Sequence, residues 1–403
     1  MLLPLFRRDN CGSVAPLFAL AVIPLFGVVG VALDYSRAAA ARTEMQSSLD
    51  AAALMLSKEA LTLTSSDLGK KARAYFKNIF NRKDTQSLAV TSSFSSLNNA
   101  YTLKLAATGN LETTFTRILG IETIDIGASS EVKWWERKLE IALVLDNTGS
   151  MAANSKMTEL KKATHNLLTT LKNAAKNPGD VKVAIIPFNT VVNLGVSYAS
   201  KPWFDWTTNG YDPTTWPGCV QDRTQPEDTK DTRPDAAKPA TLFPASACNI
   251  GSSGLLASIV PLTNDWTRLN NKVDEMTPDG TTNITIGLEW GWHALTGGAP
   301  LAQAAPPAEN LDKIIVLMTD GENTQNRWSS NASDIDARLK IACANANAAA
   351  IKIYTIRVLE GNASLLQSCA SNPTMYYDVQ NAAQLSEVFG LIANNLANLR
   401  ISK

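Results

Sequence analysis

The sequence predicts an α/β domain with a doubly wound, mostly parallel sheet, preceded by a transmembrane helix that continues into a small α+β module. Residues 139–145 and 313–319 are largely apolar runs, typical of strands buried on both faces. Further runs at 181–188 and 351–358 alternate along the chain with helical patterns. Strands that alternate with helices indicate a parallel sheet whose ligand loops lie at the carboxyl ends of its strands.

The uncharged stretch 14–33 predicts the transmembrane helix. As a helix it would be about 30 Å long, which matches the hydrocarbon core of a bilayer. A cleaved signal peptide is the alternative, with Ala38 to Ala40 as its cleavage motif. Against that alternative, an apolar stripe continues beyond the span at three- and four-residue steps, which favours one long helix. The stripe consists of Ala38, Ala41, Met45, Leu49, Ala52 and Leu56.

Two kinds of residue bear on the orientation in the membrane. Arg7 and Arg8 in the tail 1–13 favour a cytoplasmic amino terminus, whereas Arg37 and Arg42 on the far side weaken that preference. Four of the five cysteines lie far beyond the span without a C-x-x-C pair, and four cysteines allow three pairings. The most economical pairing is sequential, Cys219 with Cys248 and Cys343 with Cys369. Disulfides require an oxidising space such as the periplasm, so we expect a single-pass membrane protein with a cytoplasmic amino terminus and its bulk in such a space, periplasmic or at the cell surface.

Residues 34–136 are polar and rich in Ser and Thr, and we expect the rest of the long helix and a small α+β module there. Lys70 to Phe80 predicts a helix, and Thr113 to Leu119 a short one. Partial alternation at 101–107 and 121–132 predicts exposed antiparallel strands. Within the second domain, 137–403, residues 191–196 are expected to form a hairpin with the strand at 181–188.

Three oxygen-bearing side chains follow the first buried strand at every second position: Asp146, Thr148 and Ser150. A tight loop at the carboxyl end of a parallel strand can turn them toward one point. One carboxylate and two hydroxyls suit Mg²⁺, Mn²⁺ or Ca²⁺, and not zinc. The alternative is ordinary turn chemistry, in which Asp146 caps the next helix.

The D-x-[S/T]-x-S pattern after an apolar strand resembles the metal-ion-dependent adhesion site of von Willebrand factor A domains. The resemblance extends to Gly280–Ile284, which reads G-T-T-N-I, and to Thr319-Asp320-Gly321. It implies a divalent metal, Mg²⁺ first and Ca²⁺ or Mn²⁺ as alternatives, and a protein partner that supplies a carboxylate to the metal. The implied ligands are Asp146, Thr148, Ser150, Thr282 and Asp320, with Thr281 as the alternative to Thr282.

The amino-terminal segment resembles the TadE/TadG-type segment of tight-adherence (Flp) pilus-assembly proteins. The matching stretches are Arg7-Arg8-Asp9, Gly12-Ser13-Val14-Ala15, Asp34-Tyr35-Ser36-Arg37 and Leu49-Asp50-Ala51-Ala52-Ala53-Leu54. A prepilin peptidase that cuts after glycine would require glutamate where Leu17 stands, so we expect no cleavage after Gly12 and a permanent anchor. An insert at 197–262, rich in Pro and Trp, is similar to that of TadG-like proteins at Trp216-Pro217-Gly218-Cys219-Val220. Its tryptophans serve either a self-packed loop, which is favoured, or a partner.

These observations predict a membrane-anchored, metal-dependent binding component of a pilus assembly or secretion system, and not an enzyme. The alternatives are an envelope scaffold with a non-essential metal site, or a Mg²⁺-dependent phosphotransferase of the haloacid-dehalogenase type. The enzyme would need a second aspartate where Thr148 stands. With 37 basic and 37 acidic residues and no long charge run, a nucleic-acid partner is not expected. His165 and His293 lie outside any Cys/His cluster, which argues against zinc and histidine catalysis.

Overall fold

The computed structural model describes residues 14–97, 100–135, 137–250 and 254–401. The chain divides into two compact units, Met1–Trp135 and Glu136–Lys403. The predicted cytoplasmic tail 1–13, with Cys11 and the Gly12 position, lies outside the described residues.

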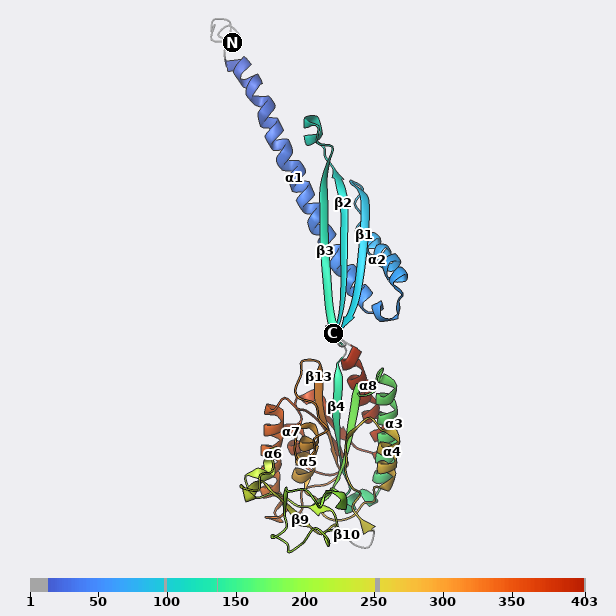
Figure 1. Ribbon diagram of the computed structural model, residues 1–403, viewed down its shortest axis with the longest axis vertical. Coiled ribbons are helices and arrows are strands. Elements are labelled where there is room, and N and C mark those ends of the chain that lie inside the picture. The colour runs from blue at the N-terminus through green and yellow to red at the C-terminus, as the bar shows by residue number, and fades with distance from the viewer. Residues whose placement is uncertain (1–13, 98–99, 136, 251–253, 402–403) are drawn as a thin grey trace, which may run out of the picture. The chain divides into compact units, whose positions relative to one another are not determined.

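The first unit packs two helices on one face of a three-stranded antiparallel sheet of order β1-β2-β3 (Figure 1). Its elements are α1 (Val14–Ser57), η2 (Ala60–Thr62), α2 (Ser65–Ile79), β1 (Thr85–Leu97), β2 (Ala100–Glu112), η3 (Thr116–Leu119) and β3 (Thr123–Trp135). Side chains at the predicted stripe of α1, among them Met45 and Leu49, are fully buried. They pack in one apolar core with Phe76 of α2 and Leu103 of β2.

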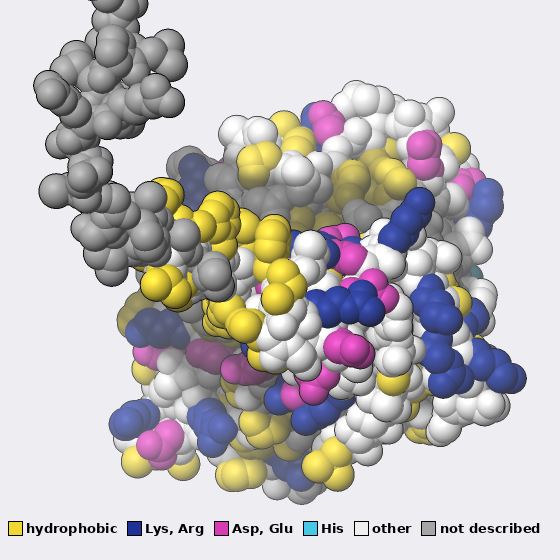
Figure 2. Space-filling model, turned by 90° about the horizontal axis from the view of Figure 1, so that it is seen from above, with side chains coloured by type: hydrophobic (Ala, Val, Ile, Leu, Met, Phe, Trp, Pro, Cys, Tyr) yellow, Lys and Arg dark blue, Asp and Glu magenta, His cyan; other side chains and the backbone are white. Residues whose placement is uncertain are grey.

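The amino-terminal half of α1 has the opposite character. Phe18, Leu25 and Phe26 are 63–69% exposed. Of the described helices, α1 is the one long and apolar enough to cross a membrane. Seen along this unit's end, exposed hydrophobic side chains form a continuous patch (Figure 2). One helix therefore has two environments, a packed carboxyl-terminal half and an uncovered apolar amino-terminal half.

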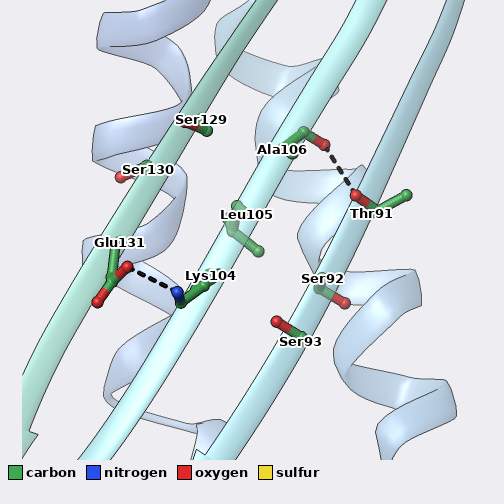
Figure 3. Close-up of a pocket in the computed structure, with 9 residues that line it drawn as sticks. All are labelled: Thr91, Ser92, Ser93, Lys104, Leu105, Ala106, Ser129, Ser130 and Glu131. Carbon is green, nitrogen blue, oxygen red and sulfur yellow. Dashed lines mark hydrogen bonds and ion pairs between the residues drawn. The ribbon is translucent and has the colours of Figure 1, made fainter.

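The sheet face opposite the helices is polar. It holds a shallow hollow of about 350 Å³ lined by side chains of all three strands, most of them polar (Figure 3). Lys104 pairs with Glu131 at 3.0 Å across it, and Thr91 Oγ1 donates to the Ala106 carbonyl at 3.5 Å. This is the ordinary arrangement of an antiparallel sheet with one face in water.

A buried carboxylate joins α1 to the connection between β2 and β3. Asp34 is fully buried and accepts hydrogen bonds from the backbone N–H groups of Thr114, Phe115 and Thr116 at 2.8–3.2 Å. The Thr116 hydroxyl donates to it as well, at 3.0 Å. Burial alone would raise the pKa of Asp34, but these donors outweigh burial and hold the pKa well below its usual range.

In the second unit, a six-stranded sheet has the order β12-β5-β4-β13-β14-β15. Neighbouring strands are parallel except for β12 at the edge, which is antiparallel to β5. The strands are β4 (Lys138–Asp146), β5 (Val181–Phe188), β12 (Val260–Thr263), β13 (Leu311–Thr319), β14 (Lys352–Val358) and β15 (Tyr376–Val379). The predicted doubly wound, mostly parallel sheet is confirmed.

Helices cover both faces of this sheet (Figure 1). One face is covered by α3 (Lys156–Ala174), α4 (Trp266–Glu275) and α8 (Leu385–Ile401), the other by α5 (Ile284–Leu295), α6 (Ala332–Ala348) and α7 (Ala363–Cys369). Every residue of α5 is buried. A Cβ at Gly287 would lie 2.6 Å from the Phe188 ring, and one at Gly291 would lie 2.5 Å from Val144. Glycine at these two positions lets α5 lie directly against the sheet.

The expected hairpin between 181–188 and 191–196 is wrong. The segment β6 (Val192–Asn193) pairs with β8 (Cys219–Val220) of the insert, and β12 takes the place beside β5. Asn189 turns the chain away, since its side chain accepts the N–H of Val191. The edge position also explains the proline in β12, because Pro261 has no N–H to donate to a second neighbour.

The insert has a small fold of its own, a four-stranded sheet of order β6-β8-β9-β7 with β7 (Phe204–Asp205) and β9 (Phe243–Ser246). Its aromatic rings pack on one another; the Phe204 and Trp216 ring centroids are 4.5 Å apart. Phe243 in turn packs 4.7 Å from Trp290 of α5. A disulfide joins Cys219 to Cys248 within this fold, and a second joins Cys343 of α6 to Cys369 of α7. The insert tryptophans are therefore largely packed on themselves.

The Asp34 contacts predict the effect of Asp34→Asn. The asparagine side chain has the same shape as that of Asp34 but lacks the negative charge that accepts hydrogen bonds from three backbone N–H groups. This loss should destabilise the connection at 113–121 by about 1.5–3 kcal/mol. Hydrogen exchange of the full chain in detergent should then speed up by roughly 10- to 150-fold at 113–121. The pKa of Asp34 is lower in the folded protein than in the unfolded chain, where it is near 4. The stabilisation from Asp34 is therefore fully present above about pH 4 and is lost as the pH falls toward the pKa of the folded protein. Asp125→Asn, at an exposed site on β3, is the control; equal exchange in both variants would contradict the account.

Candidate metal centre

The candidate site lies where two central strands end side by side. β4 and β13 are parallel neighbours, and their register places Leu145 opposite Met318. The chain leaves β4 toward α3 on one face of the sheet and leaves β13 toward α6 on the other. The two loops diverge at this point, which makes it the switch point at which doubly wound sheets bind ligands.

The loop after β4 is organised around Asp146, which is fully buried. Its Oδ1 accepts from the Thr148 N–H at 2.8 Å and from Thr148 Oγ1 at 2.6 Å, and its Oδ2 accepts from Thr319 Oγ1 at 2.5 Å. Thr148 Oγ1 lies 3.0 Å from Ser150 Oγ, which donates to Asp320 Oδ1 at 2.6 Å. The structure thus links four of the five predicted ligands in one hydrogen-bonded chain.

The fifth predicted ligand, Thr282, comes from a third loop. Thr282 is buried and its N–H donates to Thr324 Oγ1 at 2.8 Å, while Thr281 is exposed and faces Gln325. Gly149 donates its N–H to the Gly280 carbonyl at 2.9 Å, which holds the first and third loops together. Thr282 Oγ1 and Ser150 Oγ lie 3.4 and 3.6 Å from the point where a Cβ would stand on Gly321. The three loops therefore bring hydroxyls from both sides to the Asp320-Gly321 turn.

The donor set consists of two carboxylates and three hydroxyls, all oxygen. Such a set fits Mg²⁺, Mn²⁺ or Ca²⁺. In the part of the chain that the structure describes, no three His, Cys, Asp or Glu side chains gather as a metal-binding group. Above the site is an open cleft of about 450 Å³, and Ser150, Thr282 and Gly321 are part of its lining. Glu322 and Glu360 also line this cleft and are exposed.

A buried lysine reaches the same centre, and the sequence did not reveal it. Lys156, at the start of α3, is 1% exposed, and its Nζ donates to Asp320 Oδ2 at 2.6 Å and to Glu360 Oε2 at 3.2 Å. Burial acts to lower the pKa of Lys156, but Asp320 and Glu360 outweigh it and raise the pKa. Burial, and then the charge of Asp320, raises the pKa of Asp146 to about 6. An ammonium among carboxylates is the arrangement expected of a buried centre with excess negative charge.

Asp222 of the insert positions two of the metal-site loops. Its carboxylate is buried and accepts from Asn283 Nδ2 at 2.9 Å on both oxygens, and from the Arg327 N–H at 3.1 Å. Asn283 follows Thr282 directly, so Asp222 fixes the loop that carries the threonine. The neighbouring Arg223 is fully buried and donates to Glu289 of α5 at 2.7 Å. Burial raises the pKa of Asp222 to about 6, although its hydrogen bonds oppose the change.

Comparison with known protein families identifies the amino-terminal segment and the domain that holds the site. The family described as putative Flp pilus-assembly TadE/G-like matches residues 12–55, and the von Willebrand factor type A domain matches residues 253–391. The chain carries a TadE/G-like segment and a von Willebrand factor type A (VWA) domain. The predicted family memberships of these two segments, TadE/G-like and VWA, are confirmed. The VWA match includes Thr282 and Asp320 and begins within the insert 197–262, so β4 and the Asp146 loop precede it.

Several solved structures are similar to the chain. The pilus adhesin SpaC from Lactobacillus rhamnosus GG is 15% identical over 80% of this chain and 35% of its own, with a TM-score of 0.40. The vWF domain of the type V pili tip protein Mfa5 from Porphyromonas gingivalis is 12% identical over 67% of this chain and 98% of its own, with a TM-score of 0.41. Proximal thread matrix protein 1 from the mussel byssus, with a zinc-occupied MIDAS motif, is 16% identical over 65% of this chain and 46% of its own, with a TM-score of 0.36. The chain thus spans about a third of SpaC and less than half of the byssus protein. No curated protein matches it.

The Asp222 contacts predict the effect of Asp222→Ala. Removing the carboxylate leaves the Asn283 amide and the Arg327 N–H buried without an acceptor, at a cost of about 2–4 kcal/mol. Thermal unfolding should show this loss, and hydrogen exchange should increase at 281–284. Asp212→Ala in the same insert is the matched control, because Asp212 is exposed and bonds only within its own turn. Exchange at 281–284 that stays at the control level would show that Asp222 does not position the Thr282 loop.

Proposed function

We propose that the chain is a membrane-anchored binding component of a tight-adherence pilus system whose VWA domain captures a partner protein through a divalent cation. The observation that carries the proposal is the convergence of five oxygen-bearing side chains from three loops beneath an open cleft. The proposed ligands are Asp146, Thr148, Ser150, Thr282 and Asp320. Mg²⁺ is the expected ion, with Ca²⁺ or Mn²⁺ as alternatives.

The coordination number of the ion favours an anionic group on the partner. Mg²⁺ takes six ligands, so the five proposed side chains leave one position that a carboxylate from a partner would fill. Asp146 and Asp320 balance the two charges of the ion, and the Lys156 ammonium is shared between Asp320 and the exposed Glu360. Because Glu322 and Glu360 line the same cleft, a basic residue beside that carboxylate is favoured on the partner.

One observation favours a second candidate, an envelope scaffold that needs no metal. Lys156 already neutralises Asp320, and both oxygens of Asp146 accept hydrogen bonds from Thr148 and Thr319. In this alternative the ammonium takes the structural place of the ion. An enzyme is not proposed, because a phosphotransferase of the type considered would place a carboxylate at Thr148.

The anchor is the amino-terminal half of α1. We propose a single span at 14–33 with the amino terminus in the cytoplasm and the domain 137–403 in the periplasm or at the cell surface. The uncovered apolar side chains of this half support the span, and the disulfides Cys219–Cys248 and Cys343–Cys369 support an oxidising compartment.

Protease accessibility tests the anchor. Protease added outside the inner membrane of spheroplasts should degrade the chain beyond about Arg37 and leave a small membrane-held fragment, because only the span and tail are shielded. Blotting with a tag at each terminus gives the readout, and lysed spheroplasts give the control for protease activity. Protection of the carboxyl-terminal half in intact spheroplasts would reverse the proposed orientation.

Calorimetric titration with Mg²⁺ tests the metal centre. Asp146→Asn removes one of two carboxylates, and the affinity for Mg²⁺ should fall by more than about 100-fold, since even partners of metal ligands are worth 10–100-fold. Thr148→Ala should cost roughly tenfold, because water can replace a neutral ligand. Asp235→Asn, in an exposed turn of the insert, should bind as the unmodified chain does.

Capture of pilus components on the immobilised chain should fall in parallel with these affinities, and a chelator should reproduce the defect. Equal Mg²⁺ binding by the unmodified chain and by Asp146→Asn would contradict cation-dependent capture of a partner. The envelope scaffold that needs no metal would then be the remaining candidate.

A further inference from the structure

The connection between β2 and β3, residues 113–121, carries an unusual set of uncovered side chains. Ile118 is 86% exposed, Leu119 63%, Ile121 50% and Phe115 44%. These four lie within seven consecutive residues at one end of the unit. Isolated exposed apolar residues are common, but a contiguous group of this kind marks an interaction surface.

The position of this β2–β3 connection identifies its partner. A Cβ on Gly30 would lie 2.6 Å from Phe115 Cβ, so the connection touches α1 within the uncharged stretch 14–33. Asp34, one residue beyond that stretch, holds the backbone of Thr114 to Thr116. Figure 1 shows η3 beside the amino-terminal half of α1, and the exposed hydrophobic side chains there form one patch in Figure 2.

The charges around the connection fit a lipid surface. Between Thr113 and Ile121 the single charged residue is Arg117. Arg37 lies on α1 four residues beyond the end of the span 14–33. It donates to Thr114 Oγ1 at 2.6 Å and pairs with Asp84 at 3.1 Å. The charge of Arg37 is balanced by Asp34 and Asp84, which leaves Arg117 as the basic residue of the connection. Apolar side chains with an arginine among them are typical of segments that lie in the boundary between headgroups and acyl chains.

We propose that the β2–β3 connection inserts Phe115, Ile118, Leu119 and Ile121 into the interface of the same bilayer that α1 crosses. The proposal rests on the membrane anchor proposed above. It gives the first unit two membrane contacts, a spanning helix and a loop bound to that helix through Asp34. Two contacts fix the tilt of α1 and of its sheet relative to the membrane surface, which one helix does not do. The apolar surface of the connection is continuous with that of the span, and this continuity selects lipid over a protein partner.

Depth-dependent quenching tests the proposal on the full chain in vesicles of phosphatidylethanolamine and phosphatidylglycerol. A single cysteine at Ile118, in a Cys11→Ser background, carries an environment-sensitive dye; the other four cysteines form disulfides. Ile118 suits labelling because its side chain makes little contact with the fold. Leu25→Cys in the span and Ser93→Cys on the open face of the sheet are matched labelling sites, both exposed in the structure.

With nitroxide groups placed near the lipid headgroups, Ile118 should be quenched more strongly than Leu25, which lies near the middle of the span. With nitroxide groups placed deep on the acyl chains, Leu25 should be quenched more strongly than Ile118, and Ser93 should stay unquenched in both kinds of vesicle. Quenching at Leu25 together with an Ile118 signal equal to that of Ser93 would overturn the loop proposal and leave the anchor standing. A blue-shifted but unquenched Ile118 dye would also overturn it, in favour of a protein partner. Absence of quenching at Leu25 would overturn the anchor and the loop proposal with it.

Discussion

The second unit depends on the register between β4 and β13. Because Leu145 lies opposite Met318, Asp146 and Thr319 end their strands together, and the Thr319 hydroxyl donates to Asp146 Oδ2 at 2.5 Å. The next residue, Asp320, is thereby brought to the hydroxyls of the first loop. A shift of one residue would turn Asp146 to the other face of the sheet and separate the two carboxylates. Burial of both strands fixes that register, so the apolar core and the polar centre depend on the same pairing.

Two carboxylates brought together in a buried position repel each other unless a cation lies between or beside them. Lys156 supplies one such cation from the first residue of α3, with an Nζ–Oδ2 distance of 2.6 Å to Asp320. The insert supplies rigidity at the same place, since Asp222 holds Asn283 and Arg327 while Arg223 pairs with Glu289 in the core helix. A segment rich in Pro and Trp is thus part of the support of the site.

Local patterns in the sequence were enough to predict the long helix, the buried parallel strands and the loops that follow them. The apolar stripe at Met45 and Leu49 repeats with the period of a helix, and the continuous apolar run at 139–145 is typical of a buried strand. Each of these elements can therefore be predicted without knowing which residues pack against it. The contacts of Lys156 and Asp222 join residues 61 to 204 positions apart and leave no local signal. β1 was not predicted, because it is a Ser-rich edge strand in which Val90 is the one buried residue and the alternation of buried and exposed positions is weak. The hairpin expected after β5 failed because the insert recruits Val192 and Asn193 into its own sheet.

The central claim is that Asp146, Thr148, Ser150, Thr282 and Asp320 hold one divalent cation. The most direct measurement is anomalous X-ray diffraction from crystals of the chain grown with Mn²⁺, which prefers the same oxygen ligands as Mg²⁺ and scatters anomalously. The account predicts one strong peak within about 2.0–2.6 Å of Ser150 Oγ and of the other coordinating oxygens at the ends of β4 and β13. A map with no peak there, and Lys156 still bound to Asp320 at saturating Mn²⁺, would contradict it.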